Sequence, residues 1–187
     1  MDFKKLSIEG LLIATPQVYQ DDRGYFFESF NQKEFNSYLG KEVDFVQDNQ
    51  SKSSGDTIRG LHFQKAPNAQ GKLVRVIDGE IFDVVVDLRK ESKTFGHSLS
   101  VTLTSESFQA FYVPEGFAHG FQVTSNTATV FYKTTDFYNA ETEVTLAWND
   151  SGIKINWPNS VSPNLSKKDC NGLCLNTLKK EIQGENS

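Results

Sequence analysis

The stretch from Lys72 to Leu88 reads KLVRVIDGEIFDVVVDL and is the part of the sequence that decides the fold class. Two runs rich in β-branched residues, 73–77 and 81–88, flank the pair Asp78-Gly79. Such runs are typical of strands, and Asp-Gly is a pair that a type I′ hairpin turn prefers. The stretch therefore predicts two antiparallel strands that pair with each other as a hairpin.

Short runs of the same kind recur along the rest of the chain. They lie at residues 11–19, 25–30, 45–51, 57–63, 97–103, 108–113, 121–123, 127–134 and 143–146. Many short strands separated by turn signals predict a β-sandwich or barrel. Two helices are also expected, one from Gln32 to Leu39 with Asn31 as N-cap and Gly40 as its stop, and one over residues 175–182.

Length and composition predict a single globular domain over residues 1–187. The chain is 37% hydrophobic and 23% charged, and no linker or internal repeat divides it. No apolar run approaches the roughly 20 residues of a membrane span, and no apolar segment follows the first five residues. We therefore expect a cytoplasmic protein that has no contact with a membrane. Cys170 and Cys174 fit a disulfide or half of a metal site, but reduced thiols are favoured in a cytoplasmic chain.

The net charge of the chain indicates which kinds of binding partner are expected. A formal net charge of -5 argues against nucleic acid and against an anionic membrane surface, since both reward broad basic patches. A small anionic ligand is compatible with this charge, because a few arginines can hold a phosphate inside a pocket.

The histidines are the first candidates for chemistry. His62 interrupts an apolar, strand-like run at residues 58–64, where a buried histidine bonded to a backbone carbonyl would explain it equally well. His119 lies in a turn that leads into a strand, and His97 is expected on the surface.

The segment Pro114-Glu115-Gly116-Phe117-Ala118-His119 has the form Pro-x-Gly-x-x-His and resembles the second metal motif of cupins, which are double-stranded β-helix jelly rolls. A cupin metal site also needs a His-x-His pair with a following glutamate, because the ion takes three or four protein ligands. Residues 62–64 offer one imidazole and an amide. We therefore predict an all-β, cupin-type jelly roll with a few short helices and no metal.

Longer stretches, spread over nearly the whole chain, carry a further resemblance: DRGYFFESF at 22–30, QDNQS at 47–51, RGLHFQ at 59–64, QGKLVRV at 70–76, DVVVDLR at 83–89, VPEGFAHGF at 113–121 and LSKKD at 165–169. Together, and in this order, they resemble the dTDP-4-dehydrorhamnose 3,5-epimerase family. Two positions depart from the common pattern, with Gln50 in place of histidine and Tyr19 in place of phenylalanine.

The resemblance implies a substrate and a reaction. The substrate is a thymidine diphosphate sugar with a ketone at C4, and the reaction inverts C3 and C5, the carbons next to that ketone. Each inversion needs a base on one face of the sugar and an acid on the other. Removing the proton leaves negative charge on the carbonyl oxygen, which a nearby cation can stabilise. No oxidation state changes, so no cofactor is expected.

The resemblance also implies the catalytic residues. His62 is the base, Asp169 orients it, Tyr132 is the acid on the opposite sugar face, and Lys72 is the cation beside the carbonyl oxygen. Without the resemblance, a solvated aspartate, a core tyrosine and a strand-end lysine would be the ordinary explanations. Strand alternation places small residues on the same face as Tyr132, where they would leave room for a ligand.

The remaining site residues follow from the same resemblance. Arg23 and Arg59 look like diphosphate clamps, for which a planar guanidinium is suited. Arg59 and His62 would face opposite sides of a regular strand, so either Gly60 marks a bulge or only one of them points inward. Contacts to sugar, ribose or base are implied for Tyr19, Glu28, Gln47, Asn49, His119, Tyr138 and Glu143.

Three functions remain open at this point. The first is the cofactor-free 3,5-epimerase, or a relative that inverts one centre or acts as a ketoisomerase. The second is a metal-dependent cupin enzyme, and the third is a non-catalytic sugar-binding jelly roll. The third gives no reason for four residues of catalytic type at family positions. The resemblance also implies a homodimer, for which the strand at residues 11–19 could supply a pairing edge.

Overall fold

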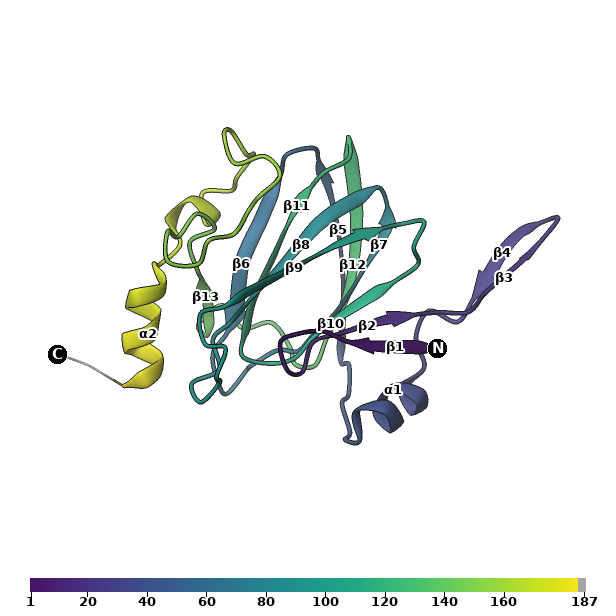
Figure 1. Cartoon of the computed structure of the whole chain (residues 1–187), viewed down its shortest axis with the longest axis horizontal. Coiled ribbons are helices and arrows are strands. Elements are labelled where there is room, and N and C mark those ends of the chain that lie inside the picture. Colours follow the sequence, from purple (N-terminus) through teal and green to yellow (C-terminus); the bar gives the residue numbers. More distant parts are fainter. Residues whose placement is uncertain (185–187) are drawn as a thin grey trace.

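The computed structural model describes residues 1–184 and consists mainly of two β-sheets that face each other (Figure 1). The six-stranded sheet has the order β1 (Asp2–Lys5), β2 (Leu12–Thr15), β10 (Ala110–Val113), β7 (Lys72–Asp78), β12 (Thr127–Thr134), β5 (Gln47–Ser54). The five-stranded sheet has the order β13 (Glu143–Thr145), β6 (Ile58–Gln64), β11 (Phe117–Val123), β8 (Glu80–Asp87), β9 (Ser98–Thr104). The predicted all-β jelly roll is confirmed.

The predicted hairpin at residues 72–88 is wrong in its pairing. The two strands exist as β7 and β8, but β7 pairs with β10 and β12, while β8 pairs with β11 and β9. Of the two turn residues only Gly79 has a positive φ, 81°, whereas a type I′ turn needs two. Strand β8 is buried on both faces over most of its length, whereas β7 is buried at Leu73, Val74 and Val76 and exposes Ile77 and Asp78. Each strand lies in the interior of its own sheet, between two other partners. The turn therefore carries the chain from one sheet to the other.

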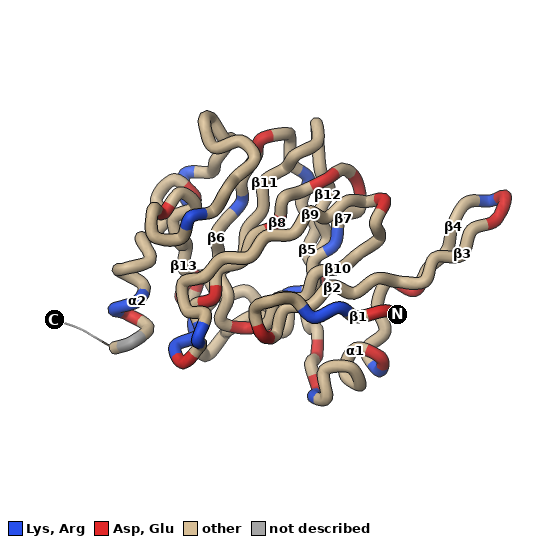
Figure 2. Tube along the Cα trace, in the orientation of Figure 1, with Lys and Arg blue, Asp and Glu red and all other residues tan. Residues whose placement is uncertain are grey.

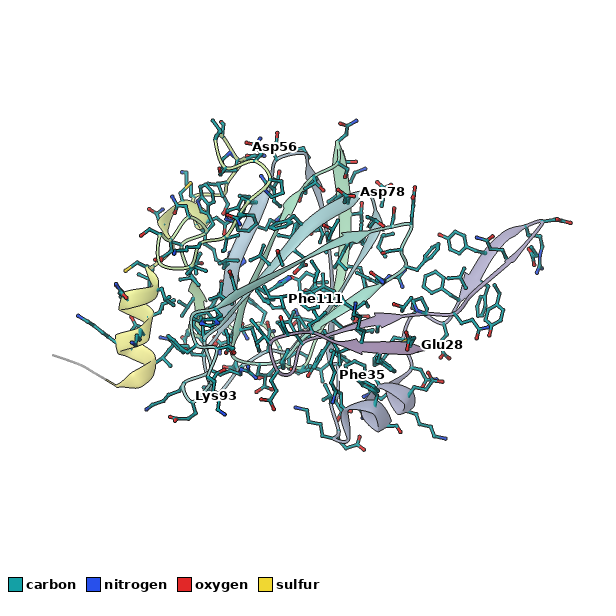
Figure 3. All side chains as sticks on the ribbon, in the orientation of Figure 1. Glu28, Phe35, Asp56, Asp78, Lys93 and Phe111 are labelled. Atoms are coloured by element: carbon teal, nitrogen blue, oxygen red, sulfur yellow. The ribbon has the colours of Figure 1, made fainter. Side chains whose placement is uncertain are left out.

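The main core fills the space between the sheets. Phe111 lies in this space (Figure 3), fully buried among Val74 and Val76 of one sheet and Ile81 and Val85 of the other. Truncation of such a buried aromatic side chain to alanine typically costs about 3–5 kcal/mol. The polar residues of β6, β7, β11 and β12 are thus set on a rigid frame.

The two predicted helices are both present. Helix α1 (Gln32–Leu39) begins after Asn31, whose side chain accepts a hydrogen bond from the Glu34 N–H, and ends at Gly40, with φ 68°. Helix α2 (Leu175–Gln183) follows a 3₁₀ turn, η1 (Asp169–Asn171). Neither helix, within the described part of the chain, is long and apolar enough to cross a membrane.

The predicted strand at residues 11–19 is two strands, β2 and β3 (Val18–Asp21). Pro16, which has no N–H to donate to a sheet, separates them. Strand β3 pairs with β4 (Gly24–Phe27), and this hairpin projects from the body at the end opposite to α2 (Figure 1). We call residues 18–27 the arm. Basic and acidic residues are interspersed along the whole trace, including the tip of the arm (Figure 2).

Candidate active site

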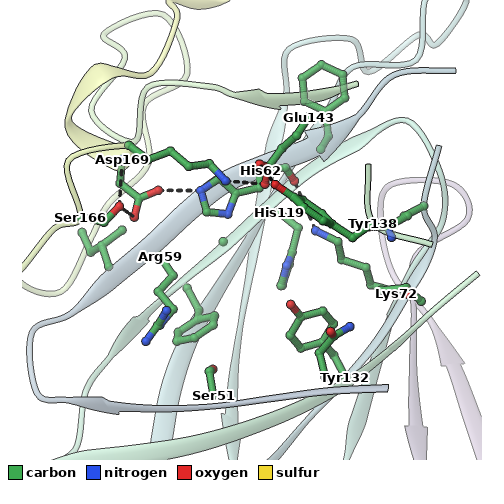
Figure 4. Close-up of a pocket in the computed structure, with 18 of the residues that line it drawn as sticks. Ser51, Arg59, His62, Lys72, His119, Tyr132, Tyr138, Glu143, Ser166 and Asp169 are labelled. Atoms are coloured by element: carbon green, nitrogen blue, oxygen red, sulfur yellow. Dashed lines mark hydrogen bonds and ion pairs between the residues drawn. The ribbon is translucent and has the colours of Figure 1, made fainter. Parts of the chain in front are cut away.

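A pocket of about 630 Å³ lies between the two sheets, with polar side chains from both of them (Figure 4). The six-stranded sheet contributes Gln47, Asn49, Ser51, Lys72, Tyr132 and Thr134. The five-stranded sheet contributes Arg59, His62, Gln64, His119 and Glu143, and the segment before α2 adds Ser166, Lys168 and Asp169. Ten of the thirteen site residues expected from sequence therefore line one cavity, Tyr138 among them.

A bulge in β6 lets Arg59 and His62 face the same pocket. The register of β6 against β11 shifts between His119 and Phe121. Gly60 has φ 127°, and a Cβ atom there would lie 2.6 Å from the Gly120 Cα. The two strands thus approach so closely that only glycine fits. Of the two alternatives that the sequence left open, the bulge is the one found.

His62 and Asp169 form a hydrogen-bonded pair on one wall of the pocket (Figure 4). His62 Nε2 lies 2.6 Å from Asp169 Oδ1, and the Ser166 hydroxyl donates to Asp169 Oδ2 at 2.7 Å. Burial favours the neutral carboxyl, but the hydrogen bonds from His62 and Ser166 outweigh it and hold the pKa of Asp169 below its usual value. The histidine thus has an ionised partner that is itself fixed.

The environment of His62 makes its imidazole a base at neutral pH. Burial lowers the pKa of His62, and the hydrogen bond to Asp169 offsets this only in part. Because Nε2 is the nitrogen bonded to the carboxylate, it carries the proton, which leaves Nδ1 as an acceptor. A neutral histidine with a free nitrogen can remove a proton from a bound ligand.

Tyr132 lies on the opposite wall, on β12 of the other sheet (Figure 4). Burial raises the pKa of Tyr132 above its usual value, which favours the protonated phenol. The predicted alternation of β12 is present, but Ala128 and Val130 fill the core beneath the pocket and do not line it. A proton donor and a proton acceptor therefore face each other across one cavity.

Lys72 begins β7 and places a cation between these two walls. Its Nζ donates to the His62 carbonyl at 3.4 Å. Burial lowers the pKa of Lys72 to about 8, against the opposing charges of Asp83 and Glu143. The preceding Gly71 donates its N–H to the Thr135 hydroxyl at 2.8 Å, which fixes the start of the strand.

A second histidine–aspartate pair lies beside the first, deeper in the sheet. His119 Nε2 lies 2.9 Å and 3.0 Å from the two oxygens of Asp83. Burial raises the pKa of Asp83, and His119 and Lys72 oppose the shift. Asp83 was missed by the sequence reasoning, although a single carboxylate inside the run IFDVVV was a signal for it.

Residues expected to bind the nucleotide also line the pocket. Arg59 Nε donates to the Ser53 hydroxyl at 2.9 Å, which fixes the plane of the guanidinium. Gln47 donates to Asn49 at 2.9 Å and accepts from the Tyr138 N–H at 3.1 Å. On β5 only alternate residues face the pocket, so Gln50 points outward to solvent.

Glu143 links two further side chains at the pocket. It accepts from the Tyr138 hydroxyl at 2.9 Å and from the Lys168 ammonium group. Lys168 lines the pocket and was not among the expected residues, although it stands directly before Asp169 in the sequence.

Three expected site residues do not join the others within one chain. Arg23 lies at the tip of the arm, 89% exposed, and pairs with Asp21 at 2.6 Å. Tyr19 is exposed on strand β3 of the arm. Glu28 is exposed at the base of the arm (Figure 3). None of the three lines the pocket of its own chain.

Two other expectations concern metals and thiols. Among residues 1–184 no group of three or more His, Cys, Asp or Glu side chains is arranged to hold a metal ion. Cys170 and Cys174 are exposed free thiols and form no disulfide.

The fold and the pocket define a class of protein: a cupin-type jelly roll with an acid–base pair set across a ligand cavity. The sequence model of the dTDP-4-dehydrorhamnose 3,5-epimerase family matches residues 5–177. The dTDP-4-dehydrorhamnose 3,5-epimerase of Salmonella typhimurium is 52% identical over 165 residues, which are 88% of this chain and 90% of the relative. The chain therefore belongs to the dTDP-4-dehydrorhamnose 3,5-epimerase family, and it is an isomerase of the epimerase type.

Solved structures agree with this assignment. A Legionella pneumophila epimerase in complex with dTDP-4-keto-L-rhamnose has a TM-score of 0.92 and 42% identity, and the match covers 97% of this chain and 96% of that one. A 3'-monoepimerase from Streptomyces bikiniensis in complex with dTDP-quinovose has a TM-score of 0.89 and 31% identity, over 95% of this chain and 90% of that one.

Proposed function

We propose that the chain inverts C3 and C5 of dTDP-4-dehydro-6-deoxy-D-glucose and so forms dTDP-4-dehydro-L-rhamnose. The observation that carries the proposal is the placement of a neutral imidazole, His62, and a protonated phenol, Tyr132, on opposite walls of one pocket. Inversion next to a ketone needs this arrangement, because the proton leaves from one face of the sugar and returns to the other.

The first half of each inversion is proton removal by His62. Its Nδ1 takes the proton from C3 or C5, the C–H electron pair forms a carbon–carbon double bond, and the carbonyl π electrons move to the C4 oxygen. Asp169 holds the imidazole and stabilises the imidazolium that forms. The Lys72 ammonium group lies beside the base, 3.4 Å from the His62 carbonyl, and a positive charge at the C4 oxygen can lower the barrier by about 3–4 kcal/mol.

The second half is proton return by Tyr132. Its phenol delivers a proton to the same carbon from the opposite face, the electrons return to the carbonyl, and the stereocentre is inverted. The Tyr132 oxygen is left as a phenolate. His62 and Tyr132 then exchange protons with solvent before the next inversion.

The remaining polar groups suit the nucleotide diphosphate. Arg59 and Lys168 offer the positive charge that a diphosphate requires, and Gln47 and Asn49 offer amides to the sugars. The exposed ring of Tyr138 beside Glu143 suits a contact with the base. That the similar Legionella protein carries dTDP-4-keto-L-rhamnose supports this ligand for the present chain.

Inversion of a single centre is the second candidate, since one of the similar structures is described as a monoepimerase. Incubation of the 4-keto nucleotide sugar with the protein in heavy water, followed by NMR, distinguishes the two. Deuterium at both C3 and C5 with both centres inverted supports the proposal. Inversion at one carbon alone would assign the chain to the monoepimerases.

We further infer that the protein acts as a homodimer in which each arm reaches the neighbouring pocket. The arm exposes Tyr25 and Phe26 to solvent, the latter 71% exposed, which a partner surface would cover. A second copy would also bring Arg23 and Glu28 to a pocket, as the family resemblance requires. The free thiols of the chain support a cytoplasmic location.

Mixed dimers test this inference. An Arg23→Ala chain and a His62→Ala chain each form a defective pocket alone, but a mixed dimer has one pocket with both residues intact. Recovery of activity on mixing supports exchange of arms, and light scattering gives the oligomeric state. If activity does not recover in dimers shown to be mixed, Arg23 does not act in the pocket of the other chain.

A further inference from the structure

Asp83 is a fully buried carboxylate that the proposed reaction does not use. It lies on β8 opposite Phe121 of β11, and its side chain points to the interior of the sandwich, as Val85 does. Its exposed fraction is 0%, and both of its oxygens lie within 3.0 Å of His119 Nε2. A carboxylate removed from water in this way is costly unless nearby groups compensate for it.

Lys72 faces the same interior space from the other sheet. Val74 and Val76, two and four residues further along β7, belong to the core between the sheets, so Lys72 stands in the same inward row. Lys72 and Asp83 are thus opposite charges that approach the pocket from its two sheets. Lys72 and His119 both line the pocket (Figure 4), and Asp83 holds the His119 ring.

Among the charges that oppose the effect of burial on the pKa of Lys72, that of Asp83 has the largest effect. Burial alone drives the pKa of Lys72 down, and the charge of Asp83 opposes the shift more than that of Glu143 does. Glu143 is already paired with Lys168. The other titratable groups that face Lys72 are His62, His119, Tyr132 and Lys168.

We propose that Asp83 is a positioning residue, which fixes the His119 ring against the pocket and supplies the negative charge that keeps Lys72 an ammonium ion. The proposal rests on the proposed epimerase function, because it matters only if Lys72 stabilises a developing oxyanion. An uncharged amine would stabilise that oxygen far less than an ammonium group. Asp83 thereby acts through two side chains without touching the substrate.

The pH dependence of kcat/KM in Asp83→Asn tests the proposal. We expect kcat/KM to fall at alkaline pH as Lys72 loses its proton. Without the opposing charge Lys72 loses it at lower pH, so the alkaline limb should move down by about one pH unit. An alkaline limb that stays in place in a folded Asp83→Asn protein would overturn the proposal, even if the rate itself fell.

Asp87→Asn is the matched control. Asp87 stands four residues further along the same inward row of β8 and is equally buried, but it is held by Arg89, Ser92 and Thr94. It is not part of the pocket lining. We expect this variant to be less stable and to keep the alkaline limb of the native protein. A shift equal to that of Asp83→Asn would show that loss of any buried carboxylate has the effect.

If Asp83→Asn folds poorly, a double-mutant cycle on the free energy of unfolding tests the proposal, and this measurement needs no enzyme activity. Removal of one member of a buried charge pair is strongly destabilising, whereas replacement of both is much less so. At pH 7 the double variant Lys72→Met/Asp83→Asn should therefore be more stable than the sum of the two single variants predicts. Additive effects on unfolding would overturn the coupling. Native protein that shows no deuterium exchange would instead overturn the proposed function and leave the cycle unaffected.

Discussion

The two histidine–aspartate pairs have similar geometry but different surroundings. In the first pair His62 is 26% exposed to the pocket, and Asp169 comes from a 3₁₀ turn outside the sheets. In the second pair His119 is 8% exposed and Asp83, on a central strand, is not exposed at all. The pKa of Asp169 is lowered, whereas burial raises that of Asp83.

A short hydrogen bond to a carboxylate does not by itself make a histidine a base. What matters is a second nitrogen open to the ligand and a carboxylate held ionised by further donors. His62 has both, since Ser166 anchors its partner and the imidazole faces the cavity. The second pair is closed in, and its charge acts on its neighbours.

The largest expected effect separates the two pairs directly. His62→Ala should lose solvent exchange at both C3 and C5, by on the order of 10² to 10⁴-fold, because proton removal stops. His119→Ala should lose only about tenfold, since it removes a contact and not the base. NMR of the sugar in heavy water measures both. Equal losses in the two variants would show that the pairs share the chemistry.

The next effect concerns residues outside both pairs. Arg59→Ala should raise KM by about 10- to 100-fold with a much smaller change in kcat, because a hydrogen-bonded charge on the diphosphate serves ground and transition states alike. Arg23→Ala should behave in the same way. Steady-state kinetics measures this. A large fall in kcat at unchanged KM would tie the arginine to the proton transfers.

A smaller effect sharpens the role of the anchored carboxylate. Ser166→Ala should lower kcat by about tenfold, through loss of the hydroxyl bond to Asp169, and should add little in an Asp169→Asn background. Ser162→Ala, an exposed serine on the same connecting segment, serves as the control and should have no effect. If Ser166→Ala lowers kcat by the same factor in the Asp169→Asn protein, the Ser166 hydroxyl does not act through Asp169.

The smallest expected effect is that of chelation. Neither pair has a third ligand within the described residues, so exhaustive treatment with a chelator should leave turnover unchanged. Metal analysis of the purified protein accompanies the assay. Stoichiometric zinc or iron whose removal abolishes turnover would make one of the pairs a metal site.

Local signals in the sequence predicted local structure well. Helix α1 begins and ends where its capping residues Asn31 and Gly40 indicated, because a cap acts through its own neighbours. The pairing of β7 and β8 could not be predicted in this way. The Asp-Gly turn favours a hairpin locally, but the partners of β7 are β10 and β12 and those of β8 are β11 and β9, and these pairings depend on strands that a local turn signal does not reach.

The site was predictable as far as the family pattern reached. That pattern brought together His62 and Asp169, more than a hundred residues apart, where spacing alone gave no reason to pair them. It could not show that Asp83 lies behind His119, because that contact depends on the register of β8 against β11. Nor could it show that Arg23 lies on a projecting arm.

The most direct test of the assigned roles is the Tyr132→Phe variant in heavy water. His62 should still form the enolate and return a deuteron from the same side, so the sugar would take up deuterium at C3 and C5 without inversion. Labelled but uninverted sugar is the result that this assignment predicts. Normal inversion in Tyr132→Phe, or deuterium uptake that persists in His62→Ala, would contradict it.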